Sequence, residues 1–224
     1  MIAGVDGCDG GWLAVMEMSD GGHFVAIYDS FEKLIANQDL KTVLIDIPIG
    51  LSSKGPRLCD IEARRFIGPR NSSVFPAPLR PMLKARSWAE ACEVRFQIEG
   101  KRCSKQAWAI TDKIRTVDEC MTPELQNRIF EGHPEVSFAC INAGQLRSGK
   151  HSDEGRQYRV QLLERHYPRV RERLRAHAGL RSELDIIDGF ACLWTARRLL
   201  NGNATRLPFE SQLDEHSLRM EINA

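Results

Sequence analysis

Three aspartates lie in apolar stretches where a folded chain would not ordinarily place a charge. Asp6 directly follows the apolar run 2–5. Asp46 interrupts the apolar run 42–47, and Asp188 lies among apolar residues near the C-terminus. Burying an unpaired carboxylate costs several kcal/mol, so acids in such places are normally paired or bound to a metal. A turn-forming role explains Asp6 equally well, whereas no local turn requires Asp46.

A second group of candidates lies in the segment EGHPE, where Glu131 and Glu135 flank His133. Because Pro134 biases the residue before it toward extended geometry, we expect 129–138 to be extended, with these three side chains on one face. Two structural alternatives stay open. His133 can be a hydrogen-bonded structural imidazole, and Glu135 can pair with an arginine.

Convergent carboxylates suit hard divalent cations. Two Mg²⁺ or Mn²⁺ ions about 4 Å apart can cleave a phosphodiester, since one activates water and the other stabilises the leaving oxygen. The seven cysteines are dispersed and contain no Cys-x-x-Cys pair, so the sequence gives no support to a zinc site. We therefore expect Mg²⁺ or Mn²⁺ as the cofactor.

The net charge of +1 in 224 residues hides a strong segregation of charge. Residues 1–50 carry eight acids and two bases, whereas 54–86 carry eight bases and two acids and 145–181 carry ten bases and four acids. Most of the bases are arginines, whose planar fork binds phosphate oxygens bidentately. Solvated helix faces also produce such blocks. Placed beside acidic motifs, the blocks indicate a phosphate-bearing partner.

The sequence also indicates where the protein resides. The first residues lack a basic segment and include two aspartates, which is unlike a signal peptide, and no apolar run is long enough to span a membrane. An odd number of dispersed cysteines is typical of free thiols in a reducing compartment. We expect a soluble, cytoplasmic protein without a membrane partner; its oligomeric state stays open, a homodimer included.

The elements that must position these residues follow from apolar periodicity and turn signals. The first fifty residues predict the order β-β-β-α-β, with strands at 2–5, 12–18, 23–28 and 42–47 and a helix at 31–37. Further helices are expected at 57–67, 87–99, 104–117, after Thr122, at 154–174 with a bend at Pro168, and at 185–200. The segment 69–81 reads as a proline-rich loop, and the tail from Pro208 permits no prediction. Gly189 would let the last helix approach the sheet closely.

An acid on the first strand, another on the fourth and a third on a late helix are the layout of a ribonuclease H-like site. We therefore expect one α/β domain over 1–224, with a mixed sheet of three antiparallel strands followed by parallel strands. Flanking helices and a helical, arginine-rich insertion at about 52–125 complete it.

Six motifs in this order resemble a bacterial and archaeal family described as a predicted nuclease of ribonuclease H-like fold, domain of unknown function 429. They are GVDGCDGGWLAV (4–15), LIDIPIGL (44–51), RLCDIEARRFIGPRNSSVFPAP (57–78), CSKQAWAITDKI (103–114), EGHPEVSF (131–138) and LDIIDGFACLWTARR (184–198). The resemblance implies that Asp6, Asp46 and Asp188 are the core acids, with Glu131 and Glu135 as further metal ligands. It also implies that substrate phosphates are approached by a basic motif and its neighbours: Arg57, Arg64, Arg65, Arg70, Asn71, Ser72, Lys105 and Gln106.

The function expected from these observations is a divalent-metal-dependent nuclease. Asp6 and Asp188 would flank the metals, Asp46 would complete the ligand shell, and Glu135 with His133 would position water or product. The expected partner is DNA or RNA, held through its backbone. Two alternatives stay open: a hydrolase or phosphotransferase acting on a small phosphate ester or nucleotide, and a non-catalytic nucleic-acid-binding module.

Overall fold

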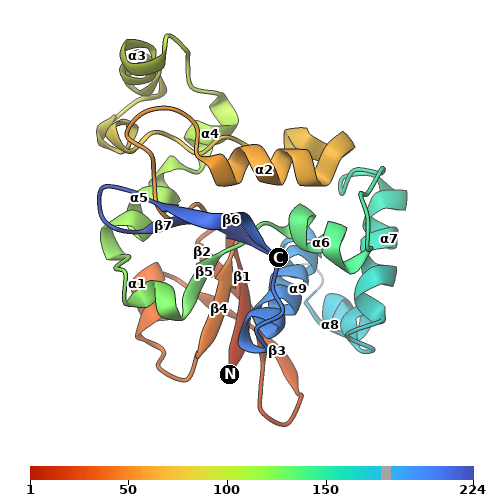
Figure 1. Ribbon diagram of the computed structural model, residues 1–224. Coiled ribbons are helices and arrows are strands. Elements are labelled where there is room, and N and C mark those ends of the chain that lie inside the picture. Colours follow the sequence, from red (N-terminus) through yellow and green to blue (C-terminus); the bar gives the residue numbers. More distant parts are fainter. Residues whose placement is uncertain (178–182) are drawn as a thin grey trace.

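A five-stranded sheet lies at the centre of the protein, which is described here by a computed structural model over residues 1–177 and 183–224 (Figure 1). Its strands are β1 (Ile2–Cys8), β2 (Gly11–Glu17), β3 (His23–Tyr28), β4 (Thr42–Ile45) and β5 (Ile129–Glu131). The strand order is β3-β2-β1-β4-β5; β1, β2 and β3 are antiparallel, and β1, β4 and β5 are parallel. The expected α/β architecture with a mixed sheet is confirmed. The carboxyl ends of β1, β4 and β5 meet at one edge.

The strands of the first fifty residues form where the sequence predicts them. The turn between β1 and β2 depends on Gly10 and Gly11, whose φ angles are 77° and 150°. A Cβ on Gly11 would lie 2.1 Å from the carbonyl oxygen of Tyr28, so the turn also needs glycine for space. This tight turn returns the chain antiparallel, and β4 then adds on the other side of β1.

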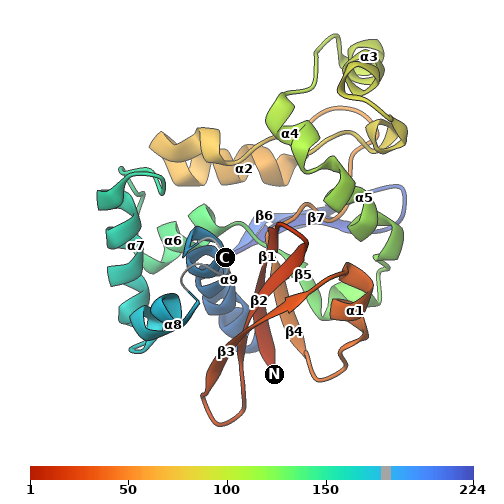
Figure 2. The same cartoon turned by 180° about the vertical axis from the view of Figure 1, so that it is seen from behind.

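Helices cover both faces of the sheet (Figure 2). On one face, α1 (Phe31–Ala36) and α5 (Thr111–Cys120) pack Phe31 and Ile114 into a core with Val5 and Ile45. The other face is covered mainly by α9 (Glu183–Leu200), with α6 (Pro134–Ile141), α7 (Asp153–Glu164) and α8 (Val170–Ala176) outside it. Because side chains alternate along a strand, β1 contributes to both cores.

The expected helical segment after β4 contains α2 (Leu58–Ile67), α3 (Trp88–Glu99) and α4 (Lys105–Ala109), with 3-10 helices at 68–73 and 80–84. The helix predicted over 104–117 is therefore two helices, α4 and α5. In Figure 1, α2 lies across the edge of the sheet where β1 and β4 end, and α3 lies farthest from the sheet. Leu79, Met82, Cys92 and Cys103 give the outer part a small core of its own.

The expectation of an extended segment over 129–138 is confirmed up to His133, whose φ is −147° and ψ 121°, and is wrong from Pro134 onward. β5 ends at Glu131, and α6 begins at Pro134 with His133 as its N-cap. Proline at the first helical position loses no hydrogen bond, because that N–H has no partner inside the helix. Glu131, His133 and Glu135 therefore do not alternate along a single strand.

Two further expectations need correction. The basic helix expected at 154–174 is two helices, α7 and α8, and Pro168 lies in the break between them. The tail forms a hairpin of β6 (Arg206–Leu213) and β7 (Arg219–Asn223), which packs on α2, and Asn223 bridges to Gly132 after β5. None of the seven cysteines, all of which lie in the described part of the chain, is in a disulfide, and five are buried. Among the described residues, no helix has the length and apolar character needed to span a membrane.

Candidate functional site

The edge of the sheet where β1 and β4 end brings Asp6 and Asp46 side by side. Val5 pairs with Ile45 across the two parallel strands, so the next residue of each strand is an aspartate. The Asp46 backbone N–H donates to the Val5 carbonyl at 2.9 Å, which continues the pairing past the end of β4. The two carboxylates predicted to act together are thus neighbours by strand register.

Helix α9 brings Asp188 to the same place, because two glycines let it lie directly on the sheet. A Cβ on Gly4 would be 2.1 Å from the Gly189 carbonyl oxygen and 2.1 Å from the Leu193 nitrogen, distances that no side chain can occupy. A Cβ on Gly189 would be 2.7 Å from a methyl of Val15. The close approach expected from Gly189 is confirmed, and Gly4 in β1 is its counterpart.

Burial raises the pKa values of all three carboxyls, and repulsion from neighbouring acids adds to the rise at Asp6 and Asp188. Burial raises the pKa of Asp6 well above its ordinary value, and the charges of Asp46 and Asp188 raise it further. Burial is also the main cause of the raised pKa of Asp46. The pKa of Asp188, whose side chain is almost fully buried, rises to about 6 through burial, although a nearby lysine opposes this rise. Protons therefore compete with any cation for this site.

Lys150 is the lysine beside these acids. Its Nζ donates to Oδ2 of Asp188 at 2.5 Å, and the burial of Asp188 makes this a shielded ion pair. The other oxygen, Oδ1 of Asp188, is buried and has no hydrogen-bond partner in the described part of the chain. No described residue donates a hydrogen bond to the carboxylate of Asp6 or Asp46 either. One ammonium group thus faces three carboxylates.

Asp6, Asp46 and Lys150 line a cavity of about 450 Å³ that opens to solvent. Further cationic or titratable side chains line the same cavity: Arg70, Lys113, His133 and His151. The exposed ring of Phe75 and the amide of Gln106 also reach it. A cavity with carboxylates on one part of its wall and cations on another can hold a metal ion and an anion together.

Glu131 is already paired with an arginine. Arg57 donates to both carboxylate oxygens of Glu131, at 2.7 and 2.8 Å, and also to the carboxylate of Asp60 at 2.5 Å. Cys59, Asp60 and Glu131 are the one group of potential ligand residues in the described chain whose ligand atoms all lie within 4.8 Å of one another. Because the Arg57 guanidinium binds both carboxylates, this group is a buried ion-pair cluster that joins α2 to β5 rather than a candidate metal centre.

Glu135 is paired in the same way. Arg159 of α7 donates to its two oxygens at 3.0 and 2.7 Å, and both side chains are almost fully buried. The contacts of Glu135 are thus those of the structural alternative stated above, in which this glutamate pairs with an arginine. Ligand roles for Glu131 and Glu135 stay predictions, and neither residue enters the site proposed below.

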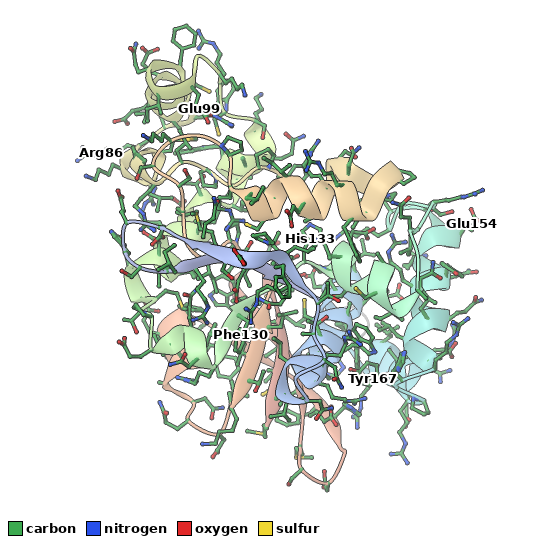
Figure 3. The ribbon with its side chains drawn as sticks, viewed as in Figure 1. Arg86, Glu99, Phe130, His133, Glu154 and Tyr167 are labelled. Atoms are coloured by element: carbon green, nitrogen blue, oxygen red, sulfur yellow. The ribbon has the colours of Figure 1, made fainter. Side chains whose placement is uncertain are left out.

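His133 lines the cavity and also makes two contacts that stabilise the fold. Its Nδ1 accepts from the Glu135 N–H at 3.2 Å and so caps α6. Its Nε2 lies 3.1 Å from the Ser73 carbonyl oxygen, which links α6 to the loop after α2. In Figure 3 the side chain lies between α2 and the sheet.

The residues of the predicted basic motif divide into two groups. Arg57, Arg70, Ser72 and Gln106 line the cavity, although Arg57 is committed to its carboxylate partners. The others do not reach it: Arg64 donates to the Val74 carbonyl, Arg65 and Asn71 are exposed, and Lys105 lies 5.5 Å from the centre of the Trp88 ring.

Sequence reasoning missed three residues of the site region. Lys113 donates to the carbonyls of Cys8 and Gly11 at 3.0 and 2.8 Å, beside the turn that follows Asp6. Lys150 and Arg159 both belong to the basic segment 145–181, which the charge count identified only as a block. No local pattern marks them, because the carbonyls to which Lys113 donates and the carboxylates to which Lys150 and Arg159 donate are all distant from them in the sequence.

Comparison with known proteins gives one match. A family model described as "Protein of unknown function (DUF429)" matches residues 4–212, which include all six quoted motifs. No curated protein and no solved structure matches the chain.

Proposed function

The chain belongs to the DUF429 family, and from this family together with the acidic cavity we propose that it is a divalent-metal-dependent nuclease that hydrolyses phosphodiester bonds of a nucleic acid. The observation that carries the proposal is the set of carboxylate oxygens without donors. Asp6 and Asp46 line the cavity without a hydrogen-bond partner among the described residues, and Oδ1 of Asp188 is buried without one. A cation would stabilise the buried Oδ1 of Asp188 and would be attracted by the two half-buried carboxylates beside it.

The fold of the proposal is ribonuclease H-like. In its support, three antiparallel strands are followed by two parallel ones in the order β3-β2-β1-β4-β5, and the acids lie at the ends of β1 and β4 and on α9. This is the arrangement that the sequence layout led us to expect. Fold alone does not determine activity, so the proposal depends on the side chains.

The proposed cation is Mg²⁺ or Mn²⁺, because the available donors are hard carboxylate oxygens. Asp6, Asp46 and Asp188 would hold it, and it would supply Lewis-acid activation of a water and charge neutralisation at the phosphate. The side chains of the protein would bind and orient the substrate. Arg70, Lys113 and His151 line the same cavity and would attract the phosphate backbone.

A second candidate function follows from the size of the cavity. Its volume of about 450 Å³ lies within the range of about 300–1,000 Å³ that is typical of small-molecule sites. A hydrolase acting on a nucleotide or another small phosphate ester would use the same carboxylates and cations. Seven cysteines outside disulfides, most of them buried, suit a reducing compartment, and we propose the cytoplasm as the location.

Cleavage assays with Mn²⁺ test the proposal directly. The substrates are single-stranded, double-stranded, hybrid and branched oligonucleotides, together with mononucleotides and a generic phosphodiester. The proteins are wild type, Asp6→Asn and the matched control Asp9→Asn, which removes an exposed acid from the adjacent turn. We expect cleavage of oligonucleotides by wild type and Asp9→Asn, and loss of at least about 100-fold in Asp6→Asn.

Three outcomes would contradict the nuclease proposal. Equal cleavage by wild type and Asp6→Asn would assign the activity to another site or to a contaminant. Hydrolysis of nucleotides but not of oligonucleotides would favour the second function. Salt-sensitive binding without cleavage by any of the proteins would favour a non-catalytic binding module.

A further inference from the structure

We infer that Lys150 permanently supplies one of the positive charges of this site, so that the acids hold a single divalent cation rather than two. The inference rests on the proposed metal site and specifies its composition. It follows from where the lysine lies, how its loop is held and how many charges surround it.

The first observation is the contact of Lys150 with the acids. The Lys150 side chain is 31% exposed, whereas that of Asp188 is only 2% exposed. The ammonium group therefore contacts a buried carboxylate and is partly withdrawn from solvent. Asp46 and Asp6 also interact electrostatically with it. Removing an ammonium group from water is unfavourable unless several negative charges compensate. Lys150 thus occupies a place where the acids need a cation.

The second observation is that the backbone around Lys150 is fixed. The Ser148 carbonyl accepts from Arg159 at 3.1 Å, and the Gly149 carbonyl accepts from the Ser152 hydroxyl at 2.9 Å. A Cβ on Gly155 would lie 2.0 Å from the Gly149 carbonyl oxygen, so the start of α7 packs directly on this loop.

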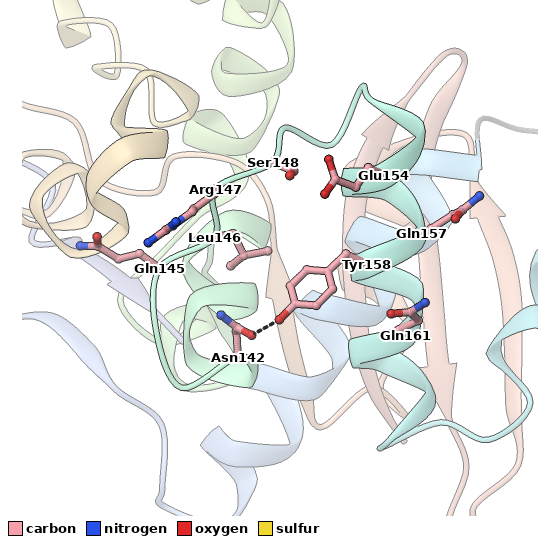
Figure 4. Close-up of a pocket in the computed structure, with 9 residues that line it drawn as sticks. All are labelled: Asn142, Gln145, Leu146, Arg147, Ser148, Glu154, Gln157, Tyr158 and Gln161. Atoms are coloured by element: carbon pink, nitrogen blue, oxygen red, sulfur yellow. Dashed lines mark hydrogen bonds between the residues drawn. The ribbon is translucent and has the colours of Figure 1, made fainter.

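Figure 4 shows the segment that leads to Lys150, whose residues Gln145 to Ser148 line a second cavity of about 400 Å³ together with residues of α7. There the Tyr158 hydroxyl donates to Asn142 at 2.6 Å and links α7 to the end of α6. These hydrogen bonds and close contacts hold the backbone on both sides of Lys150, so the position of this lysine is defined by the fold.

The third observation is the number of charges. Asp6, Asp46 and Asp188 carry three negative charges when ionised, and Lys150 carries one positive charge. One divalent cation neutralises the remaining two. A second divalent cation would leave a net positive charge beside Lys150, in a cavity that Arg70 and Lys113 also line, and like charges at this range repel.

The position of the single cation follows from the free oxygens. Oδ2 of Asp188 is bound to Lys150, whereas the carboxylates of Asp6 and Asp46 have no donor among the described residues. These two aspartates are therefore the principal ligands. Oδ1 of Asp188 is the remaining oxygen, and because the ligand atoms of the three acids do not all lie within 4.8 Å of one another, it would reach the ion only after a side-chain shift. Lys150 lines the same cavity as Arg70 and Lys113, so a phosphate bound in this cavity would be near its ammonium group. There it supplies charge that a second metal ion would otherwise provide.

Mn²⁺ titration of the full chain tests this inference without any activity measurement. Isothermal titration calorimetry gives the number of ions per chain, and electron paramagnetic resonance shows whether two Mn²⁺ ions are coupled. We expect one uncoupled Mn²⁺ in wild type, none at this site in Asp6→Asn, and one in Lys150→Arg, which keeps the charge. Lys150→Ala frees the acids and opens space, so we expect two coupled ions. The matched control Lys54→Ala, an exposed lysine outside the cavity, should bind one.

The outcomes separate the inference from the proposed function. Two coupled ions in wild type would overturn the inference and leave the metal-dependent nuclease standing. One ion in wild type and one, with unchanged affinity, in folded Lys150→Ala would also overturn it. No Mn²⁺ in wild type would instead remove the proposed metal-dependent function, and the inference would fall with it. If Lys150→Ala does not fold, Lys150→Met serves in its place, and two ions in Lys150→Arg would still contradict the inference.

Discussion

The substitution Gly4→Ala tests whether α9 lies directly on β1, the contact that places Asp188 beside Asp6. The added Cβ would lie 2.1 Å from both the Gly189 carbonyl oxygen and the Leu193 nitrogen. Both obstacles are backbone atoms of a helix, so no side-chain rotation relieves the clash. The helix must move away from the strand by about 1 Å, which loosens the core that both elements share.

The expected cost follows from this geometry. Overpacking of a tight core usually costs about 1–3 kcal/mol, and obstruction by backbone on both sides places Gly4→Ala at the upper end or above. In a chain of this size, about 3 kcal/mol lowers the Tm by about 10 °C. Because α9 carries Asp188, we also expect Mn²⁺ to stabilise the variant less than it stabilises wild type.

The assay is thermal and urea unfolding followed by circular dichroism, with and without Mn²⁺. Gly144→Ala is the matched control, because its Cβ would meet no atom within 4 Å. Gly189→Ala should be milder, since its obstacle is a side-chain methyl of Val15 and alanine favours a helix. A Gly4→Ala protein within about 0.5 kcal/mol of wild type, the range of an ordinary surface substitution, would refute the direct contact.

Two further predictions concern the charges around the site. Folding raises the pKa of Asp6, and it raises the pKa of Asp188 to about 6. At pH values just above the ordinary pKa of an aspartate, the folded protein therefore binds more protons than the unfolded chain. The free energy of unfolding of the metal-free protein should therefore fall as the pH rises from about 4 to about 7. Urea unfolding at several pH values measures this dependence, and Asp6→Asn should flatten it. A free energy of unfolding that rises over the same interval would contradict the raised pKa values. Arg159→Met leaves Glu135 buried without its partner and should cost about 3–5 kcal/mol in the same assay, whereas the double variant with Glu135→Gln should recover part of the loss. A double variant whose loss equals the sum of the losses of the two single variants would show that the pair is not coupled.

Local sequence determined the frame of the site. The turn glycines and the alternating apolar runs predict the strands of the first fifty residues, and the apolar surroundings of Asp46 and Asp188 mark them as exceptional. Even the close packing of α9 was accessible, because Gly189 is an unfavourable residue in a helix interior unless the helix packs closely. These features depend on neighbours in the chain, which a sequence displays.

The wrong predictions concern features that depend on residues distant in the sequence or that local sequence leaves ambiguous. Pro134 has two consistent interpretations, an extended residue before it or a helix that begins with it, and local sequence does not choose between them. The hairpin of β6 and β7 forms because α2 and the end of β5 offer it a surface, and both precede it by more than 70 residues. Its own sequence carries too weak a pattern to predict it.

By itself the sequence determined which acids are exceptional and which strands and helix carry them. Only the tertiary structure decided which carboxylates are left without a partner. Arg57 binds Glu131 from 74 positions away, Arg159 binds Glu135, and Lys150 binds one oxygen of Asp188 from 38 positions away. The physical reason is that a buried carboxylate takes the cation that folding brings nearest, and that distance is set by the packing of α2, α7 and α9 on the sheet rather than by spacing along the chain.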